Sequence, residues 1–86
     1  MKTVWKSVLE IKDVQSLDIP HGAEFLSAQI QQGNLCVWYR CDPAETKVKR
    51  YFSIVGTGND CPPDWEYIST FQIFQGDLIF HVFVQS

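Results

Sequence analysis

Apolar and polar side chains alternate with a period of two along much of the chain. Leu26, Ala28 and Ile30 occupy every second position, and polar residues lie between them. A β-strand with one buried face produces this alternation. The alternation does not extend backwards, because Glu24 falls on the apolar side, so we expect the strand to begin at about Phe25.

A first hairpin is predicted where Gly33 and Asn34 separate Phe25–Gln31 from Leu35–Cys41. Glycine adopts positive φ at little cost and asparagine tolerates it, so this pair is expected to close a tight turn between antiparallel strands. The second segment is dense in residues that favour strands. Of the three tryptophans, Trp38 in this segment is the first choice for the core.

A second hairpin is predicted near the end of the sequence. Glu66–Phe74 and Leu78–Val84 read as strands, and Gln75-Gly76-Asp77 forms the turn between them. Leu78–Val84 is largely apolar on both faces, which is typical of a strand that has neighbours on both sides. We therefore expect this last strand either to lie in the middle of a sheet or to be covered by a neighbouring element.

Three further segments complete the predicted sheets. Thr3–Ile11, Val14–Ile19 and Lys49–Val55 are rich in strand-forming residues, and Pro20 is expected to stop the second of them. No segment shows helical spacing over an ordinary helix length. We therefore predict an all-β fold of about seven antiparallel strands, a sandwich or partly open barrel built on hairpins, forming a single domain over residues 1–86.

The size and composition of the chain favour self-association. Hydrophobic residues make up 45% and aromatic residues 14% of only 86 residues. A domain this small buries only about 60% of the surface of its unfolded chain, so its core is thin. A shared apolar interface or paired edge strands would add burial, and a homodimer is therefore expected.

The charge balance argues against nucleic acid as a partner. Seven basic residues stand against ten acidic ones, which gives a net charge of −3. The one basic cluster, Lys47, Lys49 and Arg50, lies beside Asp42 and Glu45, as in a solvated loop. No signal peptide and no membrane span are recognised, so a cytoplasmic protein is expected.

The cysteines are expected to be free thiols. Cys36, Cys41 and Cys61 cannot all pair within one chain, and strand alternation places Cys36 and Cys41 on opposite faces. The spacing of these cysteines, and of His21 and His81, does not match a zinc site. We expect no metal and no other cofactor.

No catalytic motif is present, and we expect no enzymatic activity. The sequence contains neither a nucleophile-elbow pattern nor a zinc-protease pair of histidines. A Cys–His pair could still assemble in space. His81, between Phe80 and Val82, is more typical of a solvent-facing or hydrogen-bonded side chain than of a catalytic base.

The candidate binding surface is the glycine- and proline-containing segment from Gly56 to Trp65, together with the neighbouring loop from Asp42 to Lys49. Its two glycines could form an anion-binding nest, but nearby aspartates would repel phosphate, so a shaped connection is favoured. Trp65 is either an exposed anchor or a lid on the core. The candidate binding residues are Gly56, Thr57, Gly58, Asp60, Asp64, Trp65 and Tyr67.

Four segments carry a resemblance to known proteins: Ile19–Gln29, Phe52–Gly58, Tyr67–Gln72 and Gly76–Phe83. Through them, nearly the whole chain resembles a family of short domains of unknown function that is common in bacteriophages and prophages. Ser69 stands where that family is expected to have glycine. The resemblance implies a compact β fold and a phage context, and it brings no catalytic residues.

Three functions remain open on this basis. The resemblance is consistent with a protein that binds a host protein in the host cytoplasm and inhibits it, for example within a defence system. A second hypothesis is capture of a small nucleotide-like ligand in a pocket, although only Arg40 and Arg50 could bind phosphate in a bidentate manner. A third is a structural component of a phage. Fold alone does not decide among them.

Overall fold

Seven β-strands and no helix make up the chain in the computed structural model, which describes all 86 residues. Every pair of neighbouring strands is antiparallel, and the predicted all-β fold is confirmed. The strands are β1 (Thr3–Leu9), β2 (Val14–Pro20), β3 (Glu24–Gln31), β4 (Asn34–Cys41), β5 (Lys47–Gly56), β6 (Glu66–Ile73) and β7 (Leu78–Val84).

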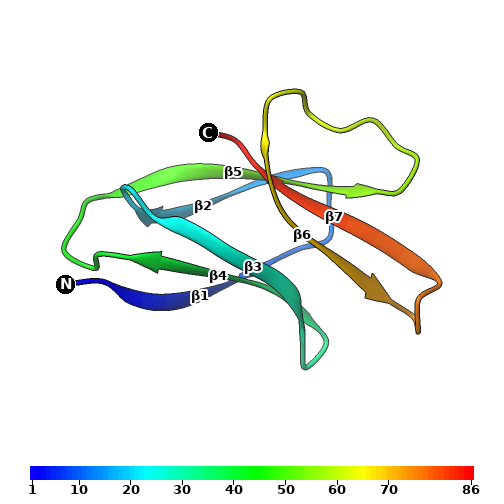
Figure 1. Cartoon of the computed structure of the whole chain (residues 1–86), viewed down its shortest axis with the longest axis horizontal. Coiled ribbons are helices and arrows are strands. Elements are labelled where there is room, and N and C mark those ends of the chain that lie inside the picture. Colours follow the sequence, from blue (N-terminus) through cyan, green and yellow to red (C-terminus); the bar gives the residue numbers. More distant parts are fainter.

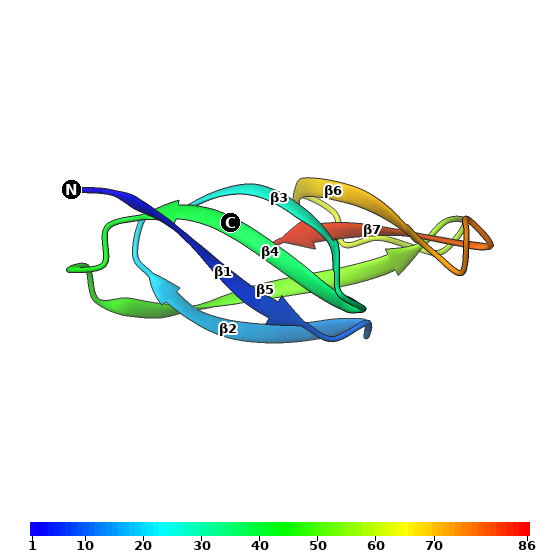
Figure 2. The same cartoon turned by 90° about the horizontal axis from the view of Figure 1, so that it is seen from below.

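The strands form two sheets that face each other as a sandwich (Figures 1 and 2). Sheet A has the strand order β1-β4-β3, and sheet B has the order β2-β5-β7-β6. β7 lies between β5 and β6, so of the two predicted arrangements of the last strand the central one is found. No helix of the length and apolarity needed to cross a membrane occurs.

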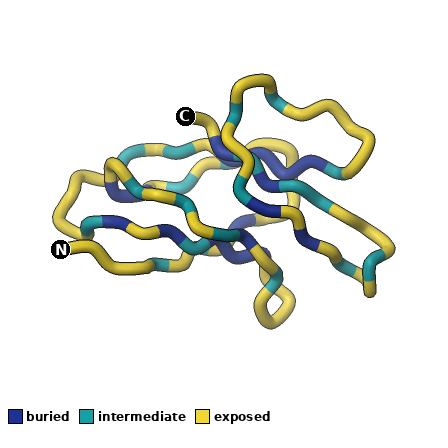
Figure 3. The backbone as a smooth tube through the Cα atoms, viewed as in Figure 1, coloured by how far each residue is buried: buried dark blue, intermediate teal, exposed yellow.

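The hydrophobic core lies between the sheets and draws on both of them. More and less exposed positions alternate along β2 and β3, β4 and β5 contain runs of consecutive buried residues, and the loops are mostly exposed (Figure 3). Phe52 of β5 is fully buried, and the ring of Phe25 from the facing sheet meets it edge-on at 5.3 Å between centroids. The core comprises Leu9, Ile19, Ala28, Leu35, Val37, Tyr39, Cys41, Phe52, Ile54, Phe71, Val82 and Val84.

The first hairpin has the predicted strands but a different turn. Gln31 pairs with Asn34, so the two turn residues are Gln32 and Gly33. Their φ angles are 51° and 83°, as a two-residue turn with two left-handed positions requires. The predicted turn pair was therefore displaced by one residue. Asn34 belongs to β4.

The second hairpin has a longer turn than the three residues predicted. Phe74, Gln75 and Gly76 all have positive φ, at 53°, 54° and 92°. Phe74 consequently leaves the strand, and it is exposed to 67%. Pro20 also differs from expectation. It is the last residue of β2, paired with Lys47, and was expected to follow the end of the strand.

A β-bulge in β3 corrects the predicted face of Leu26. Phe25 pairs with Tyr39 and Ser27 with Trp38, so Leu26 is the extra residue between two ladder positions. Phe25 therefore points into the core, whereas Leu26 is exposed to 45%. The bulge also explains why the alternation fails before this point, since it shifts the phase of the strand by one residue.

The prediction that Trp38 belongs to the core is wrong. Val37 and Tyr39 on either side of it point inward, so Trp38 lies half-buried on the outer face of sheet A. Trp5 of β1 instead packs against the core from its edge. Leu35 is a further residue of β4 that faces the core, two positions before Val37.

The two edges of the sandwich differ. On one side β3 and β6 lie against each other, and the backbone N–H of Ala28 donates to Ser69 Oγ at 3.0 Å. On the other side β1 and β2 have almost no contact. We call these the closed seam and the open seam.

Candidate functional site

The connection from β5 to β6 crosses the outer side of sheet B. β7 lies between these two strands, and β5 and β6 are parallel to each other, so the chain must travel back along the sheet to enter β6 (Figure 1). We call residues 57–65 the strap. Ser53 and Val55 are not part of the core cluster yet are only 4% and 8% exposed, and both line a cleft together with Asn59 and Asp60 of the strap.

The local conformation of the strap explains several of its residue types. Gly58 has a φ of 93° and Asp64 a φ of 66°, in the left-handed region that glycine adopts freely and aspartate tolerates. At Gly56 a Cβ atom would lie 3.1 Å from Asn59 Nδ2, so the strap folds back closely over the end of β5. These positions fit the predicted role of a shaped connection.

A chain of hydrogen bonds ties the strap to the sheet. Thr57 Oγ1 lies 2.8 Å from His81 Nε2, and His81 Nδ1 lies 2.9 Å from Thr70 Oγ1. Thr70 is the direct cross-strand partner of His81, and its hydroxyl is 2.8 Å from the Tyr67 hydroxyl. Four side chains from the strap, β6 and β7 are thus linked.

The protons of these four side chains can be placed so that every donor among them has an acceptor within the protein. Tyr67 donates to Thr70, Thr70 to His81 Nδ1, and His81 Nε2–H to Thr57. The Thr57 hydroxyl then donates to the backbone carbonyl of Ile79 at 3.4 Å. If every hydrogen bond ran in the opposite direction, the hydroxyl proton of Tyr67 would be donated to solvent. The assignment therefore makes His81 a link between strap and sheet.

Aromatic rings lie beside this hydrogen-bonded chain on the outer face of sheet B. Tyr67 is exposed to 56%, and its ring meets the ring of Phe83 edge-on at 5.9 Å between centroids. Trp65, at the end of the strap, is half-buried and is not among the residues that pack on the core. We define the strap face as the strap together with Tyr67, Thr70, His81 and Phe83.

The strap face is acidic. Asp60, Asp64 and Glu66 lie on or directly after the strap, and Asp77 lies in the following hairpin. No lysine or arginine occurs after Arg50 in the sequence. The surface therefore presents carboxylates without neighbouring cations from its own elements.

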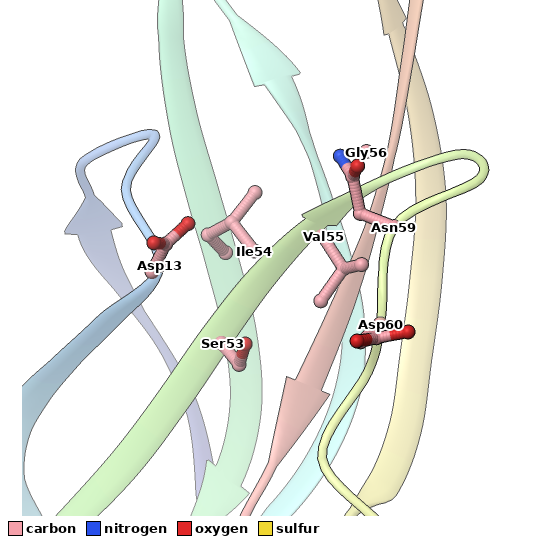
Figure 4. A pocket seen from close by; sticks show the side chains of 7 residues that line it. All are labelled: Asp13, Ser53, Ile54, Val55, Gly56, Asn59 and Asp60. Atoms are coloured by element: carbon pink, nitrogen blue, oxygen red, sulfur yellow. The ribbon is translucent and has the colours of Figure 1, made fainter.

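Two open clefts flank the beginning of the strap, each of about 370 Å³. Figure 4 shows the first, where Asp13 and Asp60 face each other across the outer side of β5. The second includes Thr57 and Asp77. Their polar groups suit a cation or a hydrogen-bond donor better than a phosphate, because carboxylates repel anions. No group of three or more metal-ligating side chains comes together in the chain.

The predicted site residues fall into three groups. Gly56, Thr57 and Asp60 line the clefts, and Gly58 and Asp64 occupy the left-handed turns. Trp65 and Tyr67 lie on the strap face. His81 and Thr70, which connect them, were missed, although the alternation of β7 already placed His81 on the outer face with Phe83.

The loop from Asp42 to Lys49 does not adjoin the beginning of the strap. It precedes β5, whereas the strap follows it (Figure 1). β5 contains ten residues, so its ends lie about 30 Å apart. The basic cluster predicted for this loop, Lys47, Lys49 and Arg50, is part of β5 itself.

The fold and the site thus define a small antiparallel β-sandwich with an acidic strap across one sheet. The chain matches, over residues 1–86, the family described as a domain of unknown function, DUF7352, and belongs to it. No curated protein and no solved structure matches the chain.

Proposed function

We propose that this domain works by binding, without catalysis, and that its strap face occupies the surface of another protein. The observation that carries the proposal is the hydrogen-bonded chain from Thr57 through His81 and Thr70 to Tyr67. It fixes an exposed tyrosine and an acidic loop on a rigid sheet before any partner arrives. A surface that is already ordered loses less conformational entropy on binding.

The composition of the strap face supports a basic partner surface. Tyrosine and tryptophan are enriched among the residues that contribute most to protein interfaces, and this face includes the exposed Tyr67 and the half-buried Trp65. Asp60, Asp64 and Glu66 lie in the same stretch of the chain and would steer a positively charged surface into contact. The same carboxylates weigh against a nucleotide in the adjoining clefts.

The hydrogen-bond pattern also weighs against catalysis at this face. A nucleophilic Thr57 would need to give its proton to His81, but the carbonyl of Ile79 at 3.4 Å competes with His81 for that proton. The group that orients His81 is a threonine hydroxyl. A hydroxyl carries no charge to stabilise the imidazolium that would form.

The resemblance to phage domains supports a more specific role. On that basis we propose that the partner is a host protein in the cytoplasm, and that occupying its surface inhibits it. The partner is expected to carry a basic patch at the contact.

Affinity capture from a host lysate tests this proposal. The immobilised domain should retain a protein that elutes as salt is raised, because exposed ion pairs are screened by salt. The eluate is analysed for proteins and for nucleotides. Retention of a nucleotide without a protein would contradict the proposal and favour ligand capture.

A further inference from the structure

His81 is held from both sides by hydroxyl groups. Its Nδ1 lies 2.9 Å from Thr70 Oγ1, and its Nε2 lies 2.8 Å from Thr57 Oγ1. Thr70 Oγ1 is in turn 2.8 Å from the Tyr67 hydroxyl. A hydroxyl can either donate or accept a hydrogen bond, whereas an ionised carboxylate can only accept. Each of these partners can therefore adapt when the imidazole gains or loses a proton.

While His81 is neutral, the hydroxyl proton of Tyr67 points inward. Nδ1 accepts from Thr70, and Thr70 accepts from Tyr67. The oxygen of Tyr67 then offers its lone pairs to the surroundings, on a side chain that is 56% exposed. In this state the strap face presents a hydrogen-bond acceptor at Tyr67.

A proton added to His81 at Nδ1 reverses these two bonds. The imidazolium carries N–H groups on both ring nitrogens, so Nδ1–H donates to Thr70 and Thr70 donates to Tyr67. The hydroxyl proton of Tyr67 then points outward as a donor. The bonds from His81 Nε2–H to Thr57, and from Thr57 to the carbonyl of Ile79, keep their direction. Only hydrogen atoms have to change place.

The charged groups around His81 belong mainly to the connections between strands. Its direct neighbours on β5 and β6 are Val55 and Thr70, and no ion pair of the chain involves His81. A proton on His81 therefore adds an unpaired positive charge to an acidic face. The titratable groups of the elements around it are Asp13 beside β5, Lys47, Lys49, Arg50 and Tyr51 in the first half of β5, Asp60, Cys61 and Asp64 of the strap, Glu66 and Tyr67 of β6, and Asp77 of the last hairpin.

We propose that His81 is a proton-operated switch of the strap face, which sets whether Tyr67 offers a partner an acceptor or a donor. The inference rests on the function proposed for that face. A basic partner brings N–H donors and positive charge, so it fits the state in which His81 is neutral. The partner's contact with Tyr67 is accordingly a lysine or arginine side chain. Histidine ordinarily changes its charge between about pH 5 and pH 8, so mild acidification releases the partner.

NMR of the free domain tests the switch without a partner. The imidazole nitrogens of His81 should show the Nε2–H tautomer at high pH and should titrate on acidification. The Cζ resonance of Tyr67 should shift with the same midpoint. Thr70→Val removes the hydroxyl between the two side chains, so Tyr67 should no longer follow His81. Thr57→Val is the matched control, because Thr57 lies on the other side of the ring and its loss should keep the coupling.

The affinity of the captured partner protein tests the consequence for binding. Because binding favours neutral His81, it expels a proton. The affinity should then fall by up to about tenfold per pH unit below the titration midpoint of His81 in the free domain. This part of the pH dependence should be absent in His81→Gln, whose amide carries no charge.

Four results would overturn the switch. They are an Nδ1–H tautomer at high pH, no titration of His81 between about pH 5 and pH 8, equal behaviour of the two valine variants, and the same pH profile of binding in His81→Gln as in the unaltered chain. None of them contradicts the function proposed for the strap face. That function fails instead if Tyr67→Ala binds the partner as the unaltered chain does, and this result would leave the coupling in the free domain unaffected.

Discussion

The three cysteines have different surroundings. Cys36 and Cys41 are 2% and 1% exposed, whereas Cys61 lies in the exposed strap. Burial, aided by the nearby charge of Asp42, raises the pKa of the Cys41 thiol above its usual value. Since the thiolate is the reactive form, Cys41 is doubly protected from reagents.

Thiol titration is therefore expected to proceed in two stages. One thiol per native chain, that of Cys61, should react rapidly with a water-soluble disulfide reagent, and all three should react after unfolding. The variant Cys61→Ser should lose the rapid stage alone. Rapid reaction of three thiols in the native protein would contradict the burial of Cys36 and Cys41.

The side chains that face the core could be predicted where apolar and polar residues alternate without interruption. The prediction failed on β4, where either of the two sets of alternate residues could face the core. On β4, Leu35, Val37 and Tyr39 share one phase, while Trp38 shares the other with Arg40. The charge of Arg40 could have identified the outer phase. The large aromatic ring of Trp38 instead led to the prediction that its face of β4 points into the core.

Among the strands, the closed seam depends on one serine. Ser69 Oγ accepts the buried N–H of Ala28 at 3.0 Å and lies 3.3 Å from Ser27 Oγ. Ser69 is 8% exposed, so water has little access to replace it. Ser69 is also the position at which the resembling phage family was expected to have glycine.

Replacing this serine should destabilise the domain. Ser69→Ala leaves the Ala28 N–H unpaired, and an unsatisfied buried donor costs about 1–3 kcal/mol. Urea unfolding measures the change in free energy. Ser27→Ala is the control, because Ser27 makes only the longer contact and should cost clearly less. Equal losses for the two variants would mean that the bond to Ala28 does not hold the seam.

Strand existence could be predicted from the sequence, but strand irregularity could not. Both β3 and β6 contain a register shift, between Phe25 and Ser27 and between Tyr67 and Ser69. A bulge inserts one residue without changing composition, so the period of two gives no direct sign of it. A break in phase, as before Leu26, is the only trace that it leaves.

At the scale of the whole molecule, sheet order decides what the strap is. The sequence indicated a loop between two strands, but it could not show that β7 lies between β5 and β6. This order turns the loop into a crossover that shares a cleft with Ser53 and Val55 and contacts His81 through Thr57. Such pairings are set by contacts between distant residues, which local patterns do not encode.

The expected homodimer stays a prediction, and the outer face of sheet A is its most suitable interface. Val4, Val8 and Leu26 are exposed there beside the half-buried Trp38. Burying this face would remove apolar area from water. Light scattering at tens of micromolar should give twice the chain mass of 9.9 kDa, and Val8→Glu should halve it. A monomer mass for the unaltered chain would contradict the dimer.

The central claim is that the strap face is the binding surface. The most direct test measures how tightly the captured partner protein binds the variant Tyr67→Ala. Tyr67 is 56% exposed, so the melting temperature should barely change, while binding should weaken by about 2 kcal/mol or more. Tyr51→Ala is the matched control, because Tyr51 is 41% exposed on the same sheet but lies outside the strap face, and it should bind as the unaltered chain does. Unchanged affinity of Tyr67→Ala, or an equal loss in Tyr51→Ala, would contradict the claim.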